Sequence, residues 1–205
     1  MPREVTIVDY EAGNLTSVRL AVQELERRPE VTADPDAVRE AERLIFPGVG
    51  AASAAMSSLR DLGLREAIVD YAATGRPMLG ICLGAQIILE RSEEGDVPCL
   101  GLMPGTVQRL SVPDGVKVPH MGWNAVTIAR DHPIWNGVES ESQFYFVHSY
   151  APVPALSHAA IGLTDYHGQF VSALAVDNVV ACQFHPERSG RVGLRVLGNF
   201  LEWEP

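Results

Sequence analysis

The sequence has few cysteines, and none of them stands in a pattern typical of a metal site or a disulfide scaffold. Its 205 residues contain Cys82, Cys99 and Cys182, and no two of these form a CxxC pair. An odd count without regular spacing predicts neither a zinc site nor a disulfide framework. We therefore expect no metal, reduced thiols and a cytoplasmic location, because disulfides are rare in that compartment.

Positive charge and long apolar runs are also scarce. The formal net charge is -10 and no basic stretch is present, which argues against a nucleic-acid partner. Asp9 interrupts the apolar run at the N-terminus, so a secretory signal is not predicted. The longest weakly polar run, residues 78–89, is too short to span a bilayer and contains Gln86. We expect no membrane partner.

The first half of the chain alternates between apolar strands and amphipathic helices. Strands are predicted at residues 5–8, 44–46 and 78–81, and helices at residues 15–25, 51–62, 64–73 and 85–90. This alternation predicts an α/β fold with a parallel sheet and helices on its faces.

The second half consists mainly of short strands separated by Gly, Pro and Asp turns. They are predicted at residues 102–113, 125–129, 143–147, 169–176 and 179–184, followed by a terminal helix at 192–203. The sequence shows no repeat and no long linker, so a single domain over residues 1–205 is expected.

The stretch GICLGAQ, residues 80–86, places Cys82 between two glycines where an apolar strand gives way to a helix. Small neighbours permit strained backbone at such a corner, and a nucleophile elbow is built in this way. The alternative is a buried structural cysteine, since free cysteine is among the most buried residue types.

A base for that thiol is predicted at the end of the 179–184 strand, in the stretch QFHPE. Ligands bind at the carboxyl ends of strands in open α/β sheets. Glu187 can hold one nitrogen of His185 and leave the other to face Cys82, because a thiol nucleophile needs a base and an orienting group. The alternative is a surface ion pair of little energetic value.

A third element is the stretch PGVG, residues 47–50, which follows the 44–46 strand. Glycines let backbone N–H groups approach a ligand closely, so this turn and the N–H of Leu83 form a candidate oxyanion hole. The alternative is an ordinary tight turn between a strand and a helix.

Together, PGVG, GICLGAQ and QFHPE, in this order along the sequence, resemble the motifs of the class I glutamine amidotransferases. The resemblance implies a single glutamine amidotransferase domain, with a mostly parallel central sheet flanked by helices. It also implies a triad of Cys82, His185 and Glu187, and no cofactor.

Three further segments resemble one branch of that family, the glutaminase subunits of imidazole glycerol phosphate synthase in histidine biosynthesis. They are VDYEAGN at residues 8–14, PHMGWN at 119–124 and YFVHSY at 145–150. The branch implies that glutamine is hydrolysed to glutamate through a cysteinyl thioester, and that ammonia passes to a second subunit.

The resemblance assigns a role to each part of the site. Cys82 attacks the side-chain amide of glutamine, His185 moves the proton, and Glu187 orients His185. The N–H groups of Val49 and Leu83 bind the oxyanion. The residues expected to hold glutamine are Gly50, Gln86, Glu94, Tyr145, Ser149 and Tyr150. The alternatives are solvent-facing helix positions for Gln86 and Glu94, and a half-buried strand position for Tyr145.

The partner implied by the resemblance is a cyclase subunit with a (β/α)8-barrel fold, in a heterodimer. The residues expected at that interface are Asn14, Pro119, His120, Met121, Gly122, Trp123 and Asn124. Tryptophan suits an interface because it combines a large apolar area with one hydrogen-bond donor, although a core position is the alternative for Trp123. A ribonucleotide bound to the cyclase is expected to activate the glutaminase, which is nearly silent alone while the Val49 peptide is misoriented.

The sequence also leaves other functions open. They are an amidotransferase for another acceptor (anthranilate or a pyridoxal phosphate precursor), an inactive homologue and a cysteine peptidase. His120, His132, His158 and His167 are interpreted as loop or surface residues, whereas His148 abuts the expected glutamine pocket. Cys99 is expected in a loop and Cys182 in a buried strand, neither with a chemical role.

Overall fold

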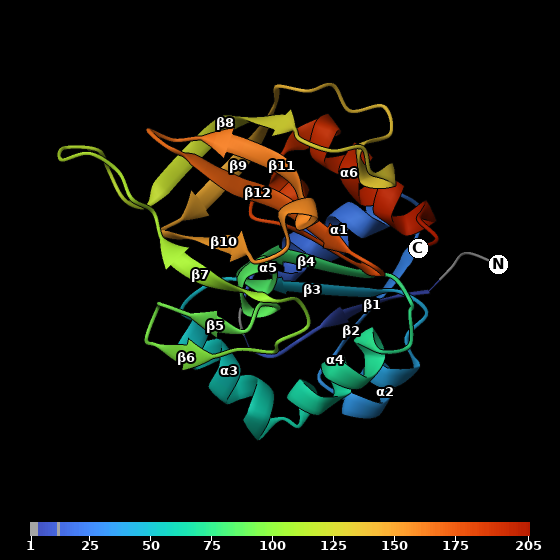
Figure 1. The fold of residues 1–205 in the computed structure, drawn as a ribbon. Helices are drawn as coiled ribbons and strands as arrows, with labels where there is room; N and C mark the ends of the chain where they lie inside the picture. The colour runs from blue at the N-terminus through green and yellow to red at the C-terminus, as the bar shows by residue number, and fades with distance from the viewer. Residues whose placement is uncertain (1–3, 12) are drawn as a thin grey trace.

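The computed structural model describes residues 4–11 and 13–205. Ala12, in the middle of the 8–14 segment singled out above, lies outside the described residues. A nine-stranded sheet crosses the molecule, and helices pack on both of its faces (Figure 1). The predicted α/β class is confirmed.

The central sheet has the spatial order β2-β1-β3-β4-β13-β12-β11-β8-β9. Its strands are β1 (Glu4–Val8), β2 (Arg28–Thr32), β3 (Leu44–Gly48), β4 (Met78–Cys82), β8 (His120–Ile128), β9 (Ser142–His148), β11 (Ala160–Asp165), β12 (Gln169–Val176) and β13 (Val179–Cys182). The pairings from β2 to β13 are parallel, as expected. Those from β13 to β9 are antiparallel, so the sheet is mixed.

A smaller four-stranded sheet has the order β10-β7-β5-β6. Its strands are β5 (Arg91–Ser92), β6 (Val97–Pro98), β7 (Gly105–Arg109) and β10 (Tyr150–Pro154). Because β10 follows β9 almost directly, the chain between the two strands joins the two sheets (Figure 1). That junction carries Ser149 and Tyr150, two of the residues predicted to hold glutamine.

The helices form two groups, one on each face of the large sheet (Figure 1). One face is covered by α2 (Pro35–Glu40), α3 (Ala52–Asp61), α4 (Leu64–Ala72) and α5 (Leu83–Ile87). The other face is covered by α1 (Leu15–Glu24) and α6 (Gly190–Glu202). Single 3-10 turns lie at Pro133–Trp135, Ser157–Ala159 and Pro186–Arg188.

Four elements of the first half are absent from the sequence prediction: β2, α2 and the two-residue strands β5 and β6. The edge strand β2 carries charged and proline residues and is only partly buried, so it lacks the apolar signature of an inner strand. The helix α2 has six residues, too few for a clear helical period. By contrast, β3 and β4 are buried at every position, which is why their apolar runs predict them correctly.

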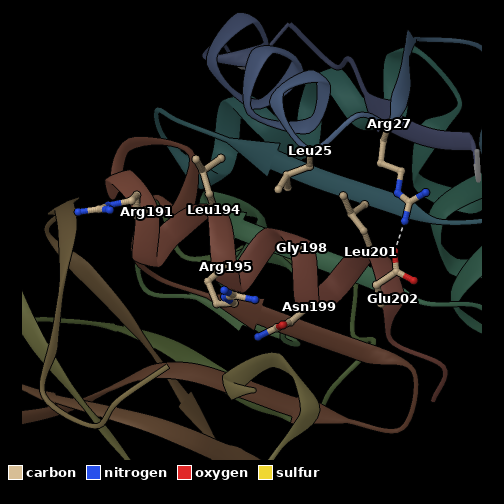
Figure 2. A pocket seen from close by; sticks show the side chains of 9 residues that line it. All are labelled: Leu25, Arg27, Arg191, Leu194, Arg195, Gly198, Asn199, Leu201 and Glu202. Atoms are coloured by element: carbon tan, nitrogen blue, oxygen red, sulfur yellow. Dashed lines mark hydrogen bonds and ion pairs between the residues drawn. The ribbon is translucent and has the colours of Figure 1, made fainter. Parts of the chain in front are cut away.

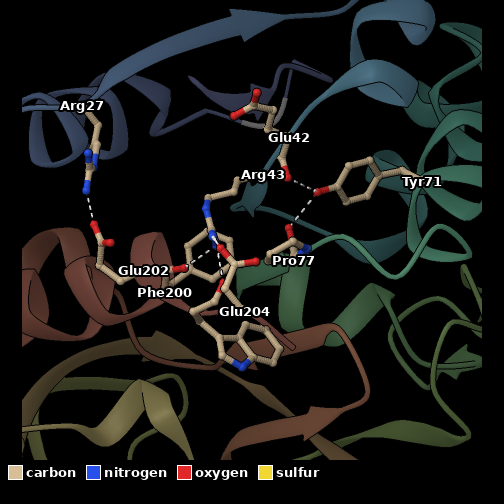
Figure 3. Close-up of polar contacts among 9 residues, drawn as sticks. Arg27, Glu42, Arg43, Tyr71, Pro77, Phe200, Glu202 and Glu204 are labelled. Atoms are coloured by element: carbon tan, nitrogen blue, oxygen red, sulfur yellow. Dashed lines mark hydrogen bonds and ion pairs between the residues drawn. The ribbon is translucent and has the colours of Figure 1, made fainter. Parts of the chain in front are cut away.

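The terminal helix α6 is anchored by a buried arginine (Figure 3). Arg43 is 3% exposed, and it donates hydrogen bonds to the carbonyls of Phe200 and Trp203 at 3.0 and 2.6 Å. It also pairs with Glu204 at 3.0 Å. A cation at the carboxyl end of a helix satisfies carbonyls that the helix leaves without donors, and it complements the helix dipole. The last helix is thereby tied to the start of β3.

The described part of the chain offers no helix with the length and apolar character needed to cross a bilayer. The helix α6 has 13 residues, whereas a transmembrane helix needs about 20.

We expect Arg43→Met to lower the free energy of unfolding by about 1–3 kcal/mol, because it removes the charge-assisted hydrogen bonds to the carbonyls of Phe200 and Trp203, although the Phe200 carbonyl keeps the N–H of Trp203 as a donor. Urea denaturation followed by circular dichroism measures this change. The matched control is Arg39→Met, which removes surface contacts to Asp36 and Asp70 and should have a much smaller effect. Equal losses of unfolding free energy in the two variants would show that the buried contacts of Arg43 stabilise the fold no more than the surface contacts of Arg39.

Candidate active site

Cys82 lies at the corner where β4 ends and α5 begins, in a strained backbone conformation. Its φ and ψ are 55° and -105°, a region that residues with a side chain rarely adopt. Gly84 allows α5 to pack directly on β3, since a Cβ at this position would lie 1.9 Å from the carbonyl oxygen of Phe46. The structure therefore has the strained strand-to-helix corner of a nucleophile elbow.

The thiol of Cys82 has two polar neighbours. The side-chain amide of Gln183 donates to Sγ at 3.7 Å, and the carbonyl oxygen of Val147 lies 3.9 Å from Sγ. The residue as a whole is 5% exposed, so both contacts lie in a largely dry environment. Such contacts have a greater orienting effect in the protein interior than in water.

His185 and Glu187 follow β13 and form a buried pair. Nδ1 of His185 lies 2.8 Å from Oε1 of Glu187, and the two side chains are 2% and 0% exposed. The buried position overturns the alternative of a surface ion pair. Asn14, at the start of α1, donates from its side-chain amide to the same carboxylate oxygen.

The backbone of His185 is held by β9 and by Ser189. Its N–H donates to the carbonyl of Tyr145 at 2.9 Å, and its carbonyl accepts from the Ser189 hydroxyl at 2.6 Å. The same hydroxyl accepts from the N–H of Tyr145 at 3.0 Å. These three bonds fix the imidazole at the carboxyl end of the sheet, beside the end of β4.

The charge of His185 is set by its two neighbours. Burial alone lowers its pKa, but the favourable interactions of the imidazolium with nearby Cys82 and Glu187 outweigh burial and raise the pKa to about 10. Nε2 of His185 has no hydrogen-bond partner among the described residues. With Nδ1 held by Glu187, Nε2 is the nitrogen that is left to exchange a proton with the thiol or with a ligand.

A cavity of about 240 Å³ opens beside Cys82. Ligand pockets for drug-sized molecules are larger, about 300–1,000 Å³, so this cavity suits a small metabolite. Its lining residues are Val49, Gly50, Cys82, Leu83, Gln86, Glu94, Pro119, Val147, His148, Ser149 and Tyr150. The structure therefore brings together the proposed nucleophile, both oxyanion candidates and five of the six residues predicted to hold glutamine.

Gln86 and Glu94 do not lie on solvent-facing helix positions. Gln86 is 5% exposed and donates to the carbonyl of Tyr150 at 2.9 Å. Glu94 lies in the turn after β5, and its carboxylate accepts from the N–H of Ala52 at 2.9 Å. Glu94 is the one charged side chain among the described residues that line the cavity.

Tyr145 is the prediction that the structure does not support, because it does not line the cavity. Its ring lies edge-on to Trp123, with ring centroids 6.2 Å apart, and the guanidinium of Arg188 stacks 4.2 Å from the ring centroid. Tyr145 is thus part of an aromatic and cationic stack on β8 and β9, and it holds His185 through its backbone alone.

The residues predicted to contact a partner divide into two groups. Met121 and Trp123 are 63% and 57% exposed, so the alternative of a core tryptophan is wrong. His120 is 3% exposed and stacks against Phe146 and Tyr166, with centroids 4.9 and 4.1 Å apart. Its ring lies in the interior, which corrects both its interface assignment and its interpretation as a surface histidine.

The remaining predicted interface residues have varied environments. Pro119 is exposed and lies on the rim of the cavity, and Gly122 is partly buried in β8. Asn124 donates to the carbonyl of Asp165 at 2.8 Å. Asn14 contacts Glu187, as described above, so it is part of the site itself.

Sequence reasoning missed the role of Gln183. It is fully buried in an otherwise apolar segment, and it contacts the thiol directly. A glutamine directly after a buried strand is the signal that could have identified it, because buried amides need partners. Cys182 lies in β13, as predicted, and Cys99 is also buried; burial raises the pKa of Cys99 to about 11.

A larger cavity of about 510 Å³ lies between α6 and the chain after α1 (Figure 2). Arg27, Arg191 and Arg195 are among its lining residues, and Arg27 pairs with Glu202. None of the residues predicted to be functional lies there, so size alone does not identify the active site. In the part of the chain that the structure describes, no group of three or more His, Cys, Asp or Glu residues could hold a metal ion.

The fold and the site define an α/β protein in which a cysteine at a strand-to-helix corner lies near a buried histidine–glutamate pair. A family model described as glutamine amidotransferase class-I matches residues 6–203. The chain belongs to this family, and the prediction from its motifs is confirmed.

Curated relatives match over nearly the full length. An imidazole glycerol phosphate synthase subunit HisH of Nitrosococcus oceani is 49% identical, over 97% of this chain and 97% of its own. The subunit of the same name from Nitrosomonas europaea is 43% identical, over 98% of this chain and 99% of its own. The predicted branch of the family is thereby confirmed.

Solved structures share the fold at low identity. PurLQS from Thermotoga maritima superposes with a TM-score of 0.76 at 18% identity, covering 98% of each chain. A glutamine amidotransferase from the same organism gives a TM-score of 0.68 at 15% identity, covering 98% of this chain and 97% of its own.

We expect the imidazole of His185 to stay protonated through neutral pH and to titrate far above an ordinary histidine. Cys82→Ala and Glu187→Gln should each lower its pKa, because each variant removes one partner that favours the imidazolium. Nitrogen-15 NMR of the ring measures the titration. His148 is an internal control, since burial lowers its pKa to about 3 and it should not titrate near pH 7. An ordinary pKa for His185 in the unmodified protein would contradict the assigned pair.

Proposed function

We propose that this chain is the glutaminase subunit of an imidazole glycerol phosphate synthase, hydrolysing glutamine and passing ammonia to a cyclase subunit. The observation that carries the proposal is the cavity beside Cys82, which the proposed nucleophile shares with nearly all predicted glutamine contacts. Identity of 43–49% to subunits of that name supports the choice of reaction.

The reaction begins when Sγ of Cys82 attacks the side-chain carbonyl carbon of glutamine. The thiol proton already lies on Nε2 of His185, whose pKa is raised to about 10, and His185 gives this proton to the leaving nitrogen as the C–N bond breaks, which releases ammonia and leaves a γ-glutamyl thioester. Glu187 keeps the imidazole oriented and stabilises its charged form. Water, activated by His185, then cleaves the thioester and releases glutamate.

Negative charge develops on the amide oxygen in both steps. The N–H groups of Leu83 and Val49 are the proposed donors to this oxyanion, since both residues line the cavity next to Cys82. Val49 is 37% exposed and lies between two glycines, where the peptide has room to turn. Its orientation is the proposed point of control by the partner.

The far end of the cavity is proposed to hold the amino-acid group of glutamine. Glu94 places a carboxylate in a cavity whose other described lining residues include no Asp, Glu, Lys or Arg, so it can pair with the α-ammonium. Gly50, Gln86, Ser149 and Tyr150 supply the surrounding backbone and amide contacts. A substrate lacking the α-ammonium would leave Glu94 without a cationic partner, which favours glutamine over simple amides.

The proposed partner is a (β/α)8-barrel cyclase, bound through the face that carries Met121 and Trp123. Both side chains are large, apolar and more than half exposed, as expected for the centre of an interface. Ammonia released into bulk water would become ammonium and lose its nucleophilicity, so a closed route to the partner is required. A cytoplasmic location remains a prediction, which three free cysteines support.

We expect the purified chain to release little glutamate from glutamine alone, and much more with a barrel cyclase and its ribonucleotide ligand. Coupled detection of glutamate measures the rate, and Cys82→Ala should abolish it, because no other described residue that lines the cavity carries a thiol.

Each other outcome has a defined meaning. Strong hydrolysis that is indifferent to the cyclase would keep Cys82 as nucleophile and assign the chain to another acceptor, such as anthranilate. Activity that persists in Cys82→Ala would overturn the triad. Silence in every condition would favour an inactive homologue.

A further inference from the structure

A pair of buried histidines connects β8 to the wall of the cavity. Nδ1 of His120 lies 3.0 Å from Nε2 of His148, and Nδ1 of His148 lies 2.8 Å from the carbonyl oxygen of Tyr150. On the other side, the side-chain amide of Asn124 lies 3.3 Å from Nε2 of His120. Both rings are at most 5% exposed, so water does not replace these contacts.

Two buried glutamines continue from the same carbonyl to the thiol. The amide nitrogen of Gln86 donates to the carbonyl of Tyr150 at 2.9 Å and to Oε1 of Gln183 at 2.9 Å. The amide nitrogen of Gln183 then donates to Sγ of Cys82 at 3.7 Å. The carbonyl of Tyr150 therefore accepts from both arms, and hydrogen bonds run without interruption from Asn124 to Cys82.

The direction of every bond in the histidine arm is fixed by its ends. A carbonyl only accepts, so Nδ1 of His148 must carry a proton. Burial lowers the pKa of His148 to about 3, so its ring is neutral and Nε2 is bare. His120 must then donate from Nδ1. Burial lowers its pKa to about 4, so it is neutral too, and its Nε2 accepts from Asn124.

The glutamine arm has one consistent arrangement as well. Gln86 uses its two N–H groups for two acceptors, and Gln183 accepts at Oε1 while it donates from Nε2. Turning either amide around would place two oxygens or two donors face to face. Each polar group of this hydrogen-bond chain thus has a partner only in this arrangement, as is expected of a satisfied polar network.

We propose that this hydrogen-bond chain positions the Cys82 thiol, and that His120, His148 and Gln183 are positioning residues that couple the exposed face of β8 to the nucleophile. The inference deepens the proposed function and rests on it for the identity of the partner face. Movement of β8, which carries Met121 and Trp123, displaces His120 and changes the bond between Gln183 and Sγ.

The test compares His120→Phe, which keeps a ring stacked on Phe146 but removes both ring nitrogens, with the matched control His132→Phe. His132 is also a partly buried histidine, but it contacts the N–H of Ile134 and the ring of Trp203, and it takes no part in the hydrogen-bond chain. The first readout is the rate of Cys82 alkylation by iodoacetamide in the free protein, with the site identified by mass spectrometry. This readout requires neither glutaminase activity nor a cyclase.

We expect His120→Phe to change the alkylation rate by about 3- to 10-fold, the effect of one hydrogen bond, while His132→Phe leaves it within about twofold. In the complex, kcat should fall by a similar factor with KM unchanged, since the cavity lining is intact. His120→Asn, whose amide can replace the Nδ1 donor, should restore part of the loss.

Coupling is tested by combining His120→Phe with Gln183→Met. If both act on Sγ through one chain, the double variant resembles Gln183→Met alone; fully additive effects would overturn the proposal. Equal rates for His120→Phe and the unmodified protein would overturn it too. If His120→Phe changes the alkylation rate but the unmodified protein shows no glutaminase activity, the proposed function is overturned, while the role of the hydrogen-bond chain in positioning the thiol is supported.

Nitrogen-15 NMR of the unmodified protein provides a readout that does not depend on any variant folding. At pH 7 both His120 and His148 should be neutral with the proton on Nδ1. A proton on Nε2 of either ring would break the chain and refute the inference.

Discussion

The backbone constraint at Cys82 determines where everything else in the site must lie. A residue with φ of 55° at the end of an inner strand is tolerated only where its surroundings leave no alternative. Here Gly84 lets α5 rest on the carbonyl of Phe46, and the parallel register pairs Gly48 with Cys82 and Ile81 with Cys182. That register brings the ends of β3, β4 and β13 to one edge, each followed by one part of the proposed machinery.

The histidines near this edge show how environment decides charge. His185 is buried but lies against Glu187 and Cys82, and its pKa is raised to about 10. Burial, with smaller contributions from His120 and His185, lowers the pKa of His148 to about 3. The first can exist as an imidazolium beside the nucleophile, and the second is a neutral link that donates and accepts one hydrogen bond each. Of these two histidines, only the one beside the nucleophile therefore carries charge.

The local motifs of the site could be predicted from the sequence, because each is a strand end followed by a short turn. The placement of Tyr145 and His120 could not, since it depends on how β8 pairs with β9. That register sets Trp123 opposite Tyr145 and His120 opposite His148. Because side chains alternate along a strand, the first pair faces outward and the second inward. The sequence of either segment alone does not show which residues of the two strands pair.

The same register explains why a surface and a nucleophile are joined by polar rather than apolar contacts. His120 stands only three residues before Trp123 but on the opposite face of β8, so the strand carries an interface on one side and the hydrogen-bond chain on the other. Apolar side chains would fill the interior equally well, but they can slide past one another without losing a specific partner. Buried polar groups cannot, because a displaced donor leaves its acceptor unpaired. A shift of β8 therefore has to break or lengthen a hydrogen bond of this network, which is how the proposed coupling would reach the thiol.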